Sequence, residues 1–573
     1  MRRATMVAAA TAVALAGCAS IPTSGPVEEG DAELAPVAPL VPILEGPRPT
    51  DGPAAIVTGF LTASASGVAT TFDVAREFLT DEAASTWNPT AQTLVYDSGG
   101  VTPEWNVATS TVSYPVPLAS TIDDSGRRLD AADDAVAPLE FELSQSEDGQ
   151  WRISELADGV VMSQASFDRF FRAVDLVFAT ADLTTAVPEL RWLPDNNIAT
   201  SAARELIEGP SPWLADAVVT GFPAAAGLAV QSVVVEEGVA TVDVTAQSAG
   251  TPEQRSLAQA QMEAMLTALP TVSRVEVLSG GLPIATAGEI ELAPAPVPEV
   301  EAAAFVGRRL GTWNGDSLTA TDPALGGVSA GAEGLARAYA GGAVAFVDSG
   351  NLLATDVLGQ QPTVPVDPDA EPAPVESALD TTMLLDGDDL VSPSFDRHGY
   401  VWTAESVGTR GLAAIAPDGT VSWLATEWIQ TRSITDLAVS REGTRVAVVS
   451  RAGGQPVVEV AAIVRDGNGV PTAIADPIVV GSGVGAAVEV EWSDDTTVGV
   501  LGEVQEGAPT TLWLVEVGGG TRPIQTIRDA VDFAARAGET SILVVASDGH
   551  AEERSGSTWV PVVEGVSELA YSG

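Results

Sequence analysis

The chain has 573 residues with 27 basic against 78 acidic side chains, a formal net charge of −51 at pH 7. A surface this acidic repels phosphate backbones and anionic lipid headgroups. Nucleic acid is therefore excluded as a partner, and a basic patch is excluded as the means of membrane attachment. The apolar content of 45% is that of folded domains, and the length corresponds to about three to four of them.

The first 17 residues have the features of a signal peptide. Arg2 and Arg3 give a positive start, and the apolar run over 4–15 is shorter than the roughly 20 residues of a membrane-spanning helix. The run ends in Leu-Ala-Gly-Cys at 15–18, which resembles the bacterial lipobox, where the cysteine receives a diacylglyceryl group before cleavage. Cys18 is the single cysteine of the chain, so we predict lipidation there and no intramolecular disulfide. The alternative is a chance run of small residues beside a buried cysteine.

We expect the mature protein to be held at the extracytoplasmic face of the cell membrane by acyl chains on Cys18, because two chains give stable retention. Residues 18–52 are rich in proline and have little apolar periodicity. They predict an extended linker between the lipid and the first folded domain.

Residues 53–187 predict an α+β domain. Helices are expected over 54–63 and 71–79, followed by strands near 93–96, 111–115, 139–144 and 151–153. Helices followed by a meandering sheet that ends in "DGQWRI" resemble a small fold of the nuclear-transport-factor-2-like (NTF2-like) shape.

Residues 190–290 predict a second α+β domain. Asn196 or Asn197 is expected to cap a helix that ends at Glu208, and strands over 228–235 and 239–244 are expected to form a hairpin. Thr251-Pro-Glu-Gln is a capping-box start for a further helix. A last strand is expected over 272–278, and residues 288–300 form a proline-rich connection.

Residues 301–573 predict strands without a long helix. Turns marked by Gly350, Gly399, Gly443, Thr496 and Gly549 recur at spacings of 49, 44, 53 and 53 residues. A period of about 40–50 residues made of strands is typical of a β-propeller with one four-stranded sheet per blade, and about six blades would fill this region. A β-sandwich is the alternative, but it has no reason to repeat at this interval. The segment 360–378 is predicted to be a solvated insertion.

The sequence offers few candidates for chemistry. The two histidines, His398 and His550, fall in blade turns, and Ser329 lies in a G-x-S-x-G pattern preceded by a glycine-rich loop instead of a strand. The glycine-rich run 481–485 is followed by a strand, so it lacks the helix N-terminus of a phosphate site. Asp494-Asp495 is interpreted as a turn. We therefore predict no catalytic residues, no metal, no cofactor and no enzyme, although a hydrolase using two carboxylates stays open.

Three segments resemble one family. "CASIPTSGPV" at 18–27, "RELIEGPSPWL" at 204–214 and "LTALPTVSRVEVLSGGLPI" at 266–284 are similar to the LpqB lipoproteins of actinobacteria, which contain a GerMN domain and end in a propeller. The resemblance implies a GerMN fold for 190–290 and a lipid on Cys18. It also implies a non-enzymatic accessory role toward a two-component sensor histidine kinase, through the extracytoplasmic domain of that kinase, with an effect on envelope growth and division.

The alternative function is a peptidoglycan- or glycan-binding envelope protein. It depends on whether propeller tryptophans line an open groove or pack between blades, and packing is the more common fate of aromatic residues at strand spacing. The tryptophans concerned are Trp402, Trp423, Trp428, Trp492 and Trp513.

Overall fold

The computed structural model describes residues 44–97, 102–132, 134–245, 250–361, 363–366, 374–504, 508–524 and 528–573. The predicted signal peptide, Cys18 and the linker as far as residue 43 lie outside these ranges. No helix within the described ranges is both long enough and apolar enough to cross a membrane.

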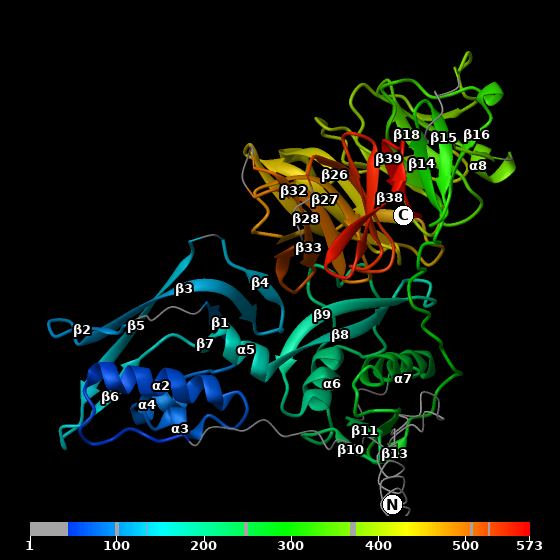
Figure 1. Cartoon of the computed structure of the whole chain (residues 1–573). Helices are drawn as coiled ribbons and strands as arrows, with labels where there is room; N and C mark the ends of the chain where they lie inside the picture. The colour runs from blue at the N-terminus through cyan, green and yellow to red at the C-terminus, as the bar shows by residue number, and fades with distance from the viewer. Residues whose placement is uncertain are drawn as a thin grey trace, which may run out of the picture. The chain divides into compact units, whose positions relative to one another are not determined.

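The first domain begins with helices that lie together on one side of its sheet (Figure 1). The helix predicted over 71–79 is much shorter, because Phe72 has φ +61° before it and Leu79 forms a bridge with Ile153 after it. The hydroxyl of Thr80 accepts a hydrogen bond from the Ala83 N–H and so begins a further helix. The helices are α2 Pro53–Gly67, α3 Asp73–Arg76, α4 Asp81–Thr86 and, after the sheet, α5 Gln164–Phe170.

The sheet of this domain has the strand order β6-β5-β3-β1-β7, with β2 and β4 paired to β3. All four predicted strands are present, and the second is extended from five residues to thirteen. The strands are β1 Gln92–Tyr96, β2 Glu104–Asn106, β3 Thr111–Asp123, β4 Arg128–Asp130, β5 Val136–Gln145, β6 Trp151–Glu155 and β7 Val160–Ser163. Buried side chains from α2 and the sheet form one core, in which Phe60 packs edge-to-face on Trp87. The α+β character agrees with the prediction, and the NTF2-like shape stays a prediction.

The second domain contains a long hairpin, two helices and a small sheet. Its strands are β8 Phe171–Ala179, β9 Ala186–Pro194, β10 Val234–Glu236, β11 Val239–Val244, β12 Arg274–Ser279 and β13 Leu282–Pro283. Helices α6 Ile198–Glu208 and α7 Pro252–Leu266 contact each other and β8. The side chains of β8 belong to the same core as those helices, so the hairpin lies with this domain although we predicted the boundary after it, near 187–190.

Local sequence explains the helix ends of this domain. Thr251 and Gln254 form the predicted capping box of α7. Asn197 precedes α6 but has φ +60° and makes no side-chain capping bond, so that part of the prediction is wrong. Gly221 lies against α7 so closely that a Cβ on it would be 2.2 Å from the Ala258 nitrogen. The strand predicted over 228–235 is also wrong for most of its length, since only Val234–Glu236 is a strand.

In the described residues the third domain consists of six sheets, which agrees with the predicted propeller and number of blades. The first strand in the chain is innermost in every sheet except the first, where β39 takes that place. The orders are β20-β16-β15-β14-β39, β17-β18-β19-β21, β22-β23-β24-β25, β26-β27-β28-β29 with β30 beside β28, β31-β32-β33-β34 and β35-β36-β37-β38. Strand β39, from the end of the described chain, pairs with β14 and supplies the innermost strand of the first sheet.

The strands of the first three sheets are short. They are β14 Ala302–Val306, β15 Arg309–Trp313, β16 Leu318–Thr321, β17 Glu333–Arg337, β18 Val344–Asp348, β19 Asn351–Thr355, β20 Thr363–Pro365, β21 Thr382–Leu385, β22 Ser394–Phe395, β23 Val401–Ala404, β24 Leu412–Ile415 and β25 Val421–Leu424. Short helical turns interrupt them at η2 Pro323–Leu325, α8 Val357–Gln360 and η3 Ile429–Thr431.

The remaining sheets have longer strands. They are β26 Arg432–Val439, β27 Arg445–Ala452, β28 Gln455–Arg465, β29 Pro471–Ile474, β30 Ile478–Val480, β31 Ala486–Trp492, β32 Thr497–Glu503, β33 Thr510–Glu516, β34 Thr521–Pro523, β35 Ala530–Ala535, β36 Ile542–Ala546, β37 His550–Ser555 and β38 Thr558–Glu564. Strand β39, Glu568–Ala570, completes the first sheet.

Two details of the predicted repeat differ from the structure. Gly399, Gly443 and Thr496 lie between the first and second strands of their sheets, whereas Gly350 and Gly549 lie between the second and third. Both turns have the same Asp/Gly chemistry, so the sequence alone does not separate them. In the predicted insertion, residues 363–365 form β20, an added outer strand of the first sheet, while 362 and 367–373 lie outside the described residues.

Candidate functional site

The innermost strands of the propeller surround a central channel of about 360 Å³. Six carboxylates line it, Glu333 from β17 and five others from β26, β31, β35 and β39. These five are Asp436, Glu489, Glu491, Asp532 and Glu568. Each accepts a hydrogen bond from a backbone N–H of the next innermost strand. The bonds are Asp436 to Val490 N (2.8 Å), Glu489 to Phe533 N (3.5 Å), Glu491 to Ala535 N (2.5 Å), Asp532 to Leu569 N (3.0 Å) and Glu568 to Leu335 N (2.9 Å).

Burial gives these carboxyl groups unusual proton affinities. Removal from water, followed by repulsion from neighbouring carboxylates, raises the pKa of Glu568 to about 8. Burial raises the pKa of Asp436 to about 7 and that of Asp532 to about 6, against the lowering effect of their backbone hydrogen bonds. Burial also raises the pKa of Glu489 and of Glu491, and the carboxyl of Glu489 hydrogen-bonds that of Asp532. The channel is therefore partly protonated near neutral pH.

The channel carboxylates hold neighbouring blades together. Because the blades are arranged radially, the innermost strands of neighbouring blades do not pair with each other. A carboxylate that accepts a backbone N–H from the next innermost strand supplies a hydrogen bond in place of that pairing. Arg441 is a buried cation beside them, and its guanidinium donates to the carbonyls of Trp492 (3.0 Å) and Ser493 (2.7 Å). Among the described residues, no group of three His, Cys, Asp or Glu side chains is arranged to hold a metal ion.

Sequence reasoning missed the channel. Its signal was a carboxylate inside an otherwise apolar strand, as in "AVEVEW" at 487–492 and "AVDFAA" at 530–535. A charged residue in such a strand is buried only with a partner. With 78 acidic residues in the chain, that signal did not stand out.

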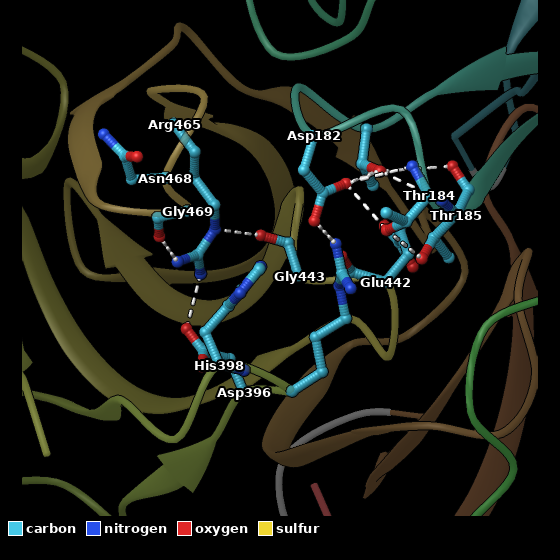
Figure 2. Close-up of polar contacts among 12 residues, drawn as sticks. Asp182, Thr184, Thr185, Asp396, His398, Glu442, Gly443, Arg465, Asn468 and Gly469 are labelled. Atoms are coloured by element: carbon cyan, nitrogen blue, oxygen red, sulfur yellow. Dashed lines mark hydrogen bonds and ion pairs between the residues drawn. The ribbon is translucent and has the colours of Figure 1, made fainter.

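A second polar cluster joins the β8–β9 turn to the propeller (Figure 2). The Asp182 carboxylate accepts hydrogen bonds from Arg397 at 2.8 Å and from the hydroxyls of Thr180 (2.6 Å) and Thr184 (2.8 Å). Partial burial alone would raise the pKa of Asp182, but these hydrogen bonds outweigh it and lower the pKa. The second domain is thereby bonded directly to a propeller turn.

Beside this contact, Arg465 closes a blade turn. Its guanidinium donates to Asp396 at 2.5 Å and to the carbonyls of Gly443 at 2.6 Å and Gly469 at 2.8 Å (Figure 2). His398 lies in the same cluster, where burial and then the two nearby arginines lower its pKa. Burial and the two nearby arginines therefore favour the neutral form of the His398 imidazole.

A buried ion pair lies at the same junction. Arg445 donates to Glu442 at 2.7 Å, and both side chains are almost fully buried, at 1% and 0% exposure. The same guanidinium donates to the Pro188 carbonyl of β9 (3.3 Å) and to the Asp495 carbonyl (2.6 Å). Arg445 therefore connects two blade turns with the second domain, and breaking it would leave an unpaired buried charge.

The other residues that the sequence singled out have structural surroundings. His550 lies 3.2 Å from Asp548 and 3.3 Å from Glu564 at the surface. The backbone N–H of Ser329 donates to Asp348 at 3.1 Å, and its hydroxyl accepts from Gly331. In the described part of the chain, no hydrogen bond joins Ser329 to a histidine.

The predicted turns are present as turns. Asp494 accepts the N–H groups of Thr496 (3.0 Å) and Thr497 (2.8 Å), which is the geometry of an Asp-initiated turn. The glycine-rich run 481–485 is followed by strand β31, as expected, and the Ser482 hydroxyl donates to the Asp130 carbonyl of the first domain. Cys18, the predicted lipidation site, lies outside the described residues.

Three of the five propeller tryptophans singled out in the sequence are buried, and Trp423 and Trp428 are partly buried. Trp402, Trp492 and Trp513 are 0%, 3% and 8% exposed and belong to the cores between blades, which confirms the packing interpretation. The indole of Trp428 donates to the Ala475 carbonyl, and the Arg410 guanidinium lies 4.0 Å from the centre of the Trp423 ring.

Family models match three consecutive parts of the chain. They are the N-terminal domain of lipoprotein LpqB over 46–168, the sporulation and spore germination (Germane) domain over 175–285, and the lipoprotein LpqB beta-propeller domain over 309–570. The second match begins inside β8, in agreement with the packing of that hairpin.

Curated relatives match over nearly the whole length. A lipoprotein LpqB of Thermobifida fusca is 27% identical over 89% of this chain and 89% of its own. One from Cutibacterium acnes is 27% identical over 99% of this chain and 98% of its own. Among solved structures, the tandem GerMN domains of the sporulation protein GerM from Bacillus subtilis match 25% of this chain and 58% of that chain, at 16% identity and a TM-score of 0.17.

Proposed function

We propose that this chain, which belongs to the LpqB lipoprotein family, is an accessory protein that modulates a two-component sensor histidine kinase at the membrane. It acts without catalysis, by binding the extracytoplasmic domain of the kinase, and so influences envelope growth and division. The observation that carries the proposal is the match to this family along the chain, together with a lipobox cysteine at residue 18.

The chemistry of the chain suits this role. Lipid on Cys18 would hold the folded domains beside the membrane, where a sensor kinase presents its outer domain. The side-chain bonds of Arg397 and Arg445 support a binding surface that spans the second and third domains. A body with a net charge of −51 binds best to a surface that carries basic groups, because complementary charge speeds encounter and suppresses wrong partners.

The proposal is tested with the purified lipoprotein and the purified outer domain of the kinase from the same host. We expect saturable binding that weakens as salt is raised, since screening removes the charge attraction. In vesicles that contain the intact kinase, adding the lipoprotein should change the rate of autophosphorylation. A Cys18→Ala form, which cannot be lipidated, should still bind the outer domain in solution but have a weaker effect on vesicles.

Two outcomes would contradict the proposal. One is the absence of binding to the outer domain at tens of micromolar protein together with an unchanged kinase rate. The other is recovery of cell-wall polymer, and no kinase, when the lipoprotein is cross-linked in its own host. The second outcome would instead support the envelope-glycan alternative.

A further inference from the structure

A cavity of about 580 Å³ lies where the helical layer of the first domain meets the start of α6. Its walls come from the segments 68–72, 122–126 and 192–208, with residues 231–232 at the rim. The volume falls in the range of about 300–1,000 Å³ that is usual for small-molecule sites. The cavity is separate from the propeller channel and from the polar cluster around Asp182.

One wall of the cavity is apolar and aromatic. Phe72, Phe171 and Trp192 line it. The indole N–H of Trp192 is buried and has no acceptor among the described residues. Buried indole N–H groups usually find a partner, so this unpaired donor is unusual, but it lies beneath the surface of the cavity and does not face a ligand.

The lining also contains polar side chains that make no hydrogen bonds with the rest of the described protein, and all of them except Glu205 are exposed to solvent. They include the amides of Asn196, Asn197 and Gln231 and the carboxyl groups of Asp124 and Glu205. Burial, followed by repulsion from Glu208, raises the pKa of Glu205 to about 7. Attraction to Arg191 and Arg204 offsets part of this rise.

Two of the eight described non-glycine residues with positive φ line the cavity. Phe72 has φ +61° and Asn197 has φ +60°, and both line the cavity. Asparagine adopts the left-handed conformation routinely, whereas for other non-glycine residues it costs on the order of 1–3 kcal/mol. For a bulky residue such as Phe72 this conformation is a genuine outlier.

The charges select the class of ligand. Four carboxylates line the cavity against the single cation Arg204, which disfavours an anionic ligand. They are Asp123, Asp124, Glu205 and Glu208. A cationic ligand would use only the acceptors and make no use of the amide donors of Asn196 and Asn197. Hydroxyl groups both donate and accept, so a polyhydroxylated ligand can satisfy both kinds of group while its C–H faces pack on the aromatic wall.

We propose that this cavity binds an uncharged oligosaccharide, with Phe72, Phe171 and Trp192 against the sugar ring and Asn197 and Glu205 bonded to its hydroxyl groups. This inference does not rest on the proposed action on a kinase. It gives the envelope-glycan alternative a location in the first two domains in place of the propeller.

The test uses the full-length lipoprotein in detergent and three neutral trisaccharide probes: chitotriose in its N-acetylated form, cellotriose and mannotriose. Isothermal titration calorimetry should show 1:1 binding of at least one probe. Trp192→Leu and Glu205→Gln should each weaken that binding ten-fold or more, whereas Glu263→Gln, an exposed carboxylate change on α7, should leave it unaltered.

A third variant separates a loss of binding from a loss of folding. Asn197→Gly removes the amide at a position whose φ suits glycine, so the protein should keep its fold while the probe binds at least five-fold more weakly. Glu237→Gly, at φ +50° in the β10–β11 turn, is the matched control and should not change affinity. The proposal is overturned if no probe binds at millimolar concentration, if the three site variants bind as well as the natural chain, or if trilysine binds in place of the sugars.

Discussion

The Asp436 carboxyl in the propeller channel should make the stability of the protein depend on pH. Its pKa is raised to about 7, chiefly by burial and to a smaller extent by Asp532, against the hydrogen bonds from Val490 and Leu437 and the hydroxyl of Ser392. A raised pKa means that the folded state favours the protonated group. Stability from this group is therefore greatest below the ordinary value of 3.8, and is lost as the pH rises toward 7.

The loss of stability follows from the two pKa values of Asp436, 3.8 in the unfolded chain and about 7 in the folded protein. Each pH unit between them removes roughly 1.4 kcal/mol, so raising the pH from 5 to 8 should cost the folded protein about 3 kcal/mol through this group alone. Asp436→Asn keeps an acceptor oxygen for the Val490 N–H, 2.8 Å away, but cannot ionise. The variant should have nearly the stability of the natural chain at pH 5 and be clearly more stable at pH 8.

The measurement is guanidinium unfolding of the full-length protein at both pH values, followed by tryptophan fluorescence. The quantity compared is the difference in midpoint between variant and natural chain, because the other channel carboxyl groups titrate in both. Asp388→Asn, an exposed change in the same domain, is the control. If the advantage of Asp436→Asn is equal at pH 5 and pH 8, or is larger at pH 5, burial of the carboxyl is not what sets its proton affinity.

Three further changes test the packing. Glu442→Gln should destabilise the propeller by roughly 3 kcal/mol in denaturant unfolding, because it leaves buried Arg445 uncompensated; a loss below 1 kcal/mol would mean that water reaches the pair. Gly221→Ala should lower the thermal midpoint by an amount equivalent to about 1–3 kcal/mol through contact with α7, and an unchanged midpoint would contradict that close approach. Thr251→Ala should cost about 1 kcal/mol in thermal unfolding, whereas Thr251→Ser, which keeps the cap, should cost little; equal losses would rule out capping as the cause.

Local signals predicted the elements that they specify directly. The capping box at Thr251 and the glycine at 209 fix the start of α7 and the end of α6 in the structure as they do in the sequence. The recurring turns predicted the propeller because each blade repeats the same hairpin chemistry. The predicted turns did not all mark the same position within a blade. Turns such as those at Gly350 and Gly399 have similar sequences although they follow different strands of their sheets.

Features that depend on distant partners could not be predicted. The hairpin β8–β9 looks like part of the preceding domain until its side chains are seen to pack on α6 and α7. The channel carboxylates, such as Glu568, accept N–H groups from strands far away in the sequence. The cavity that contains Phe72 and Asn197 brings together segments more than a hundred residues apart, so no local pattern indicates it.

The pairing of β39 with β14 has a consequence for how the protein reaches its native state. Ala303 lies opposite Ala570, so the first blade stays without its inner strand until nearly the whole domain has been synthesised. A nascent chain grows from its N-terminal end, and contacts between such distant residues form slowly. The first two domains can be complete while the ring is still open, and during that interval the unpaired edge of β14 is available for mispairing with other chains. Chaperones that cover unpaired strand edges would therefore affect the yield of this domain more than that of the domains before it.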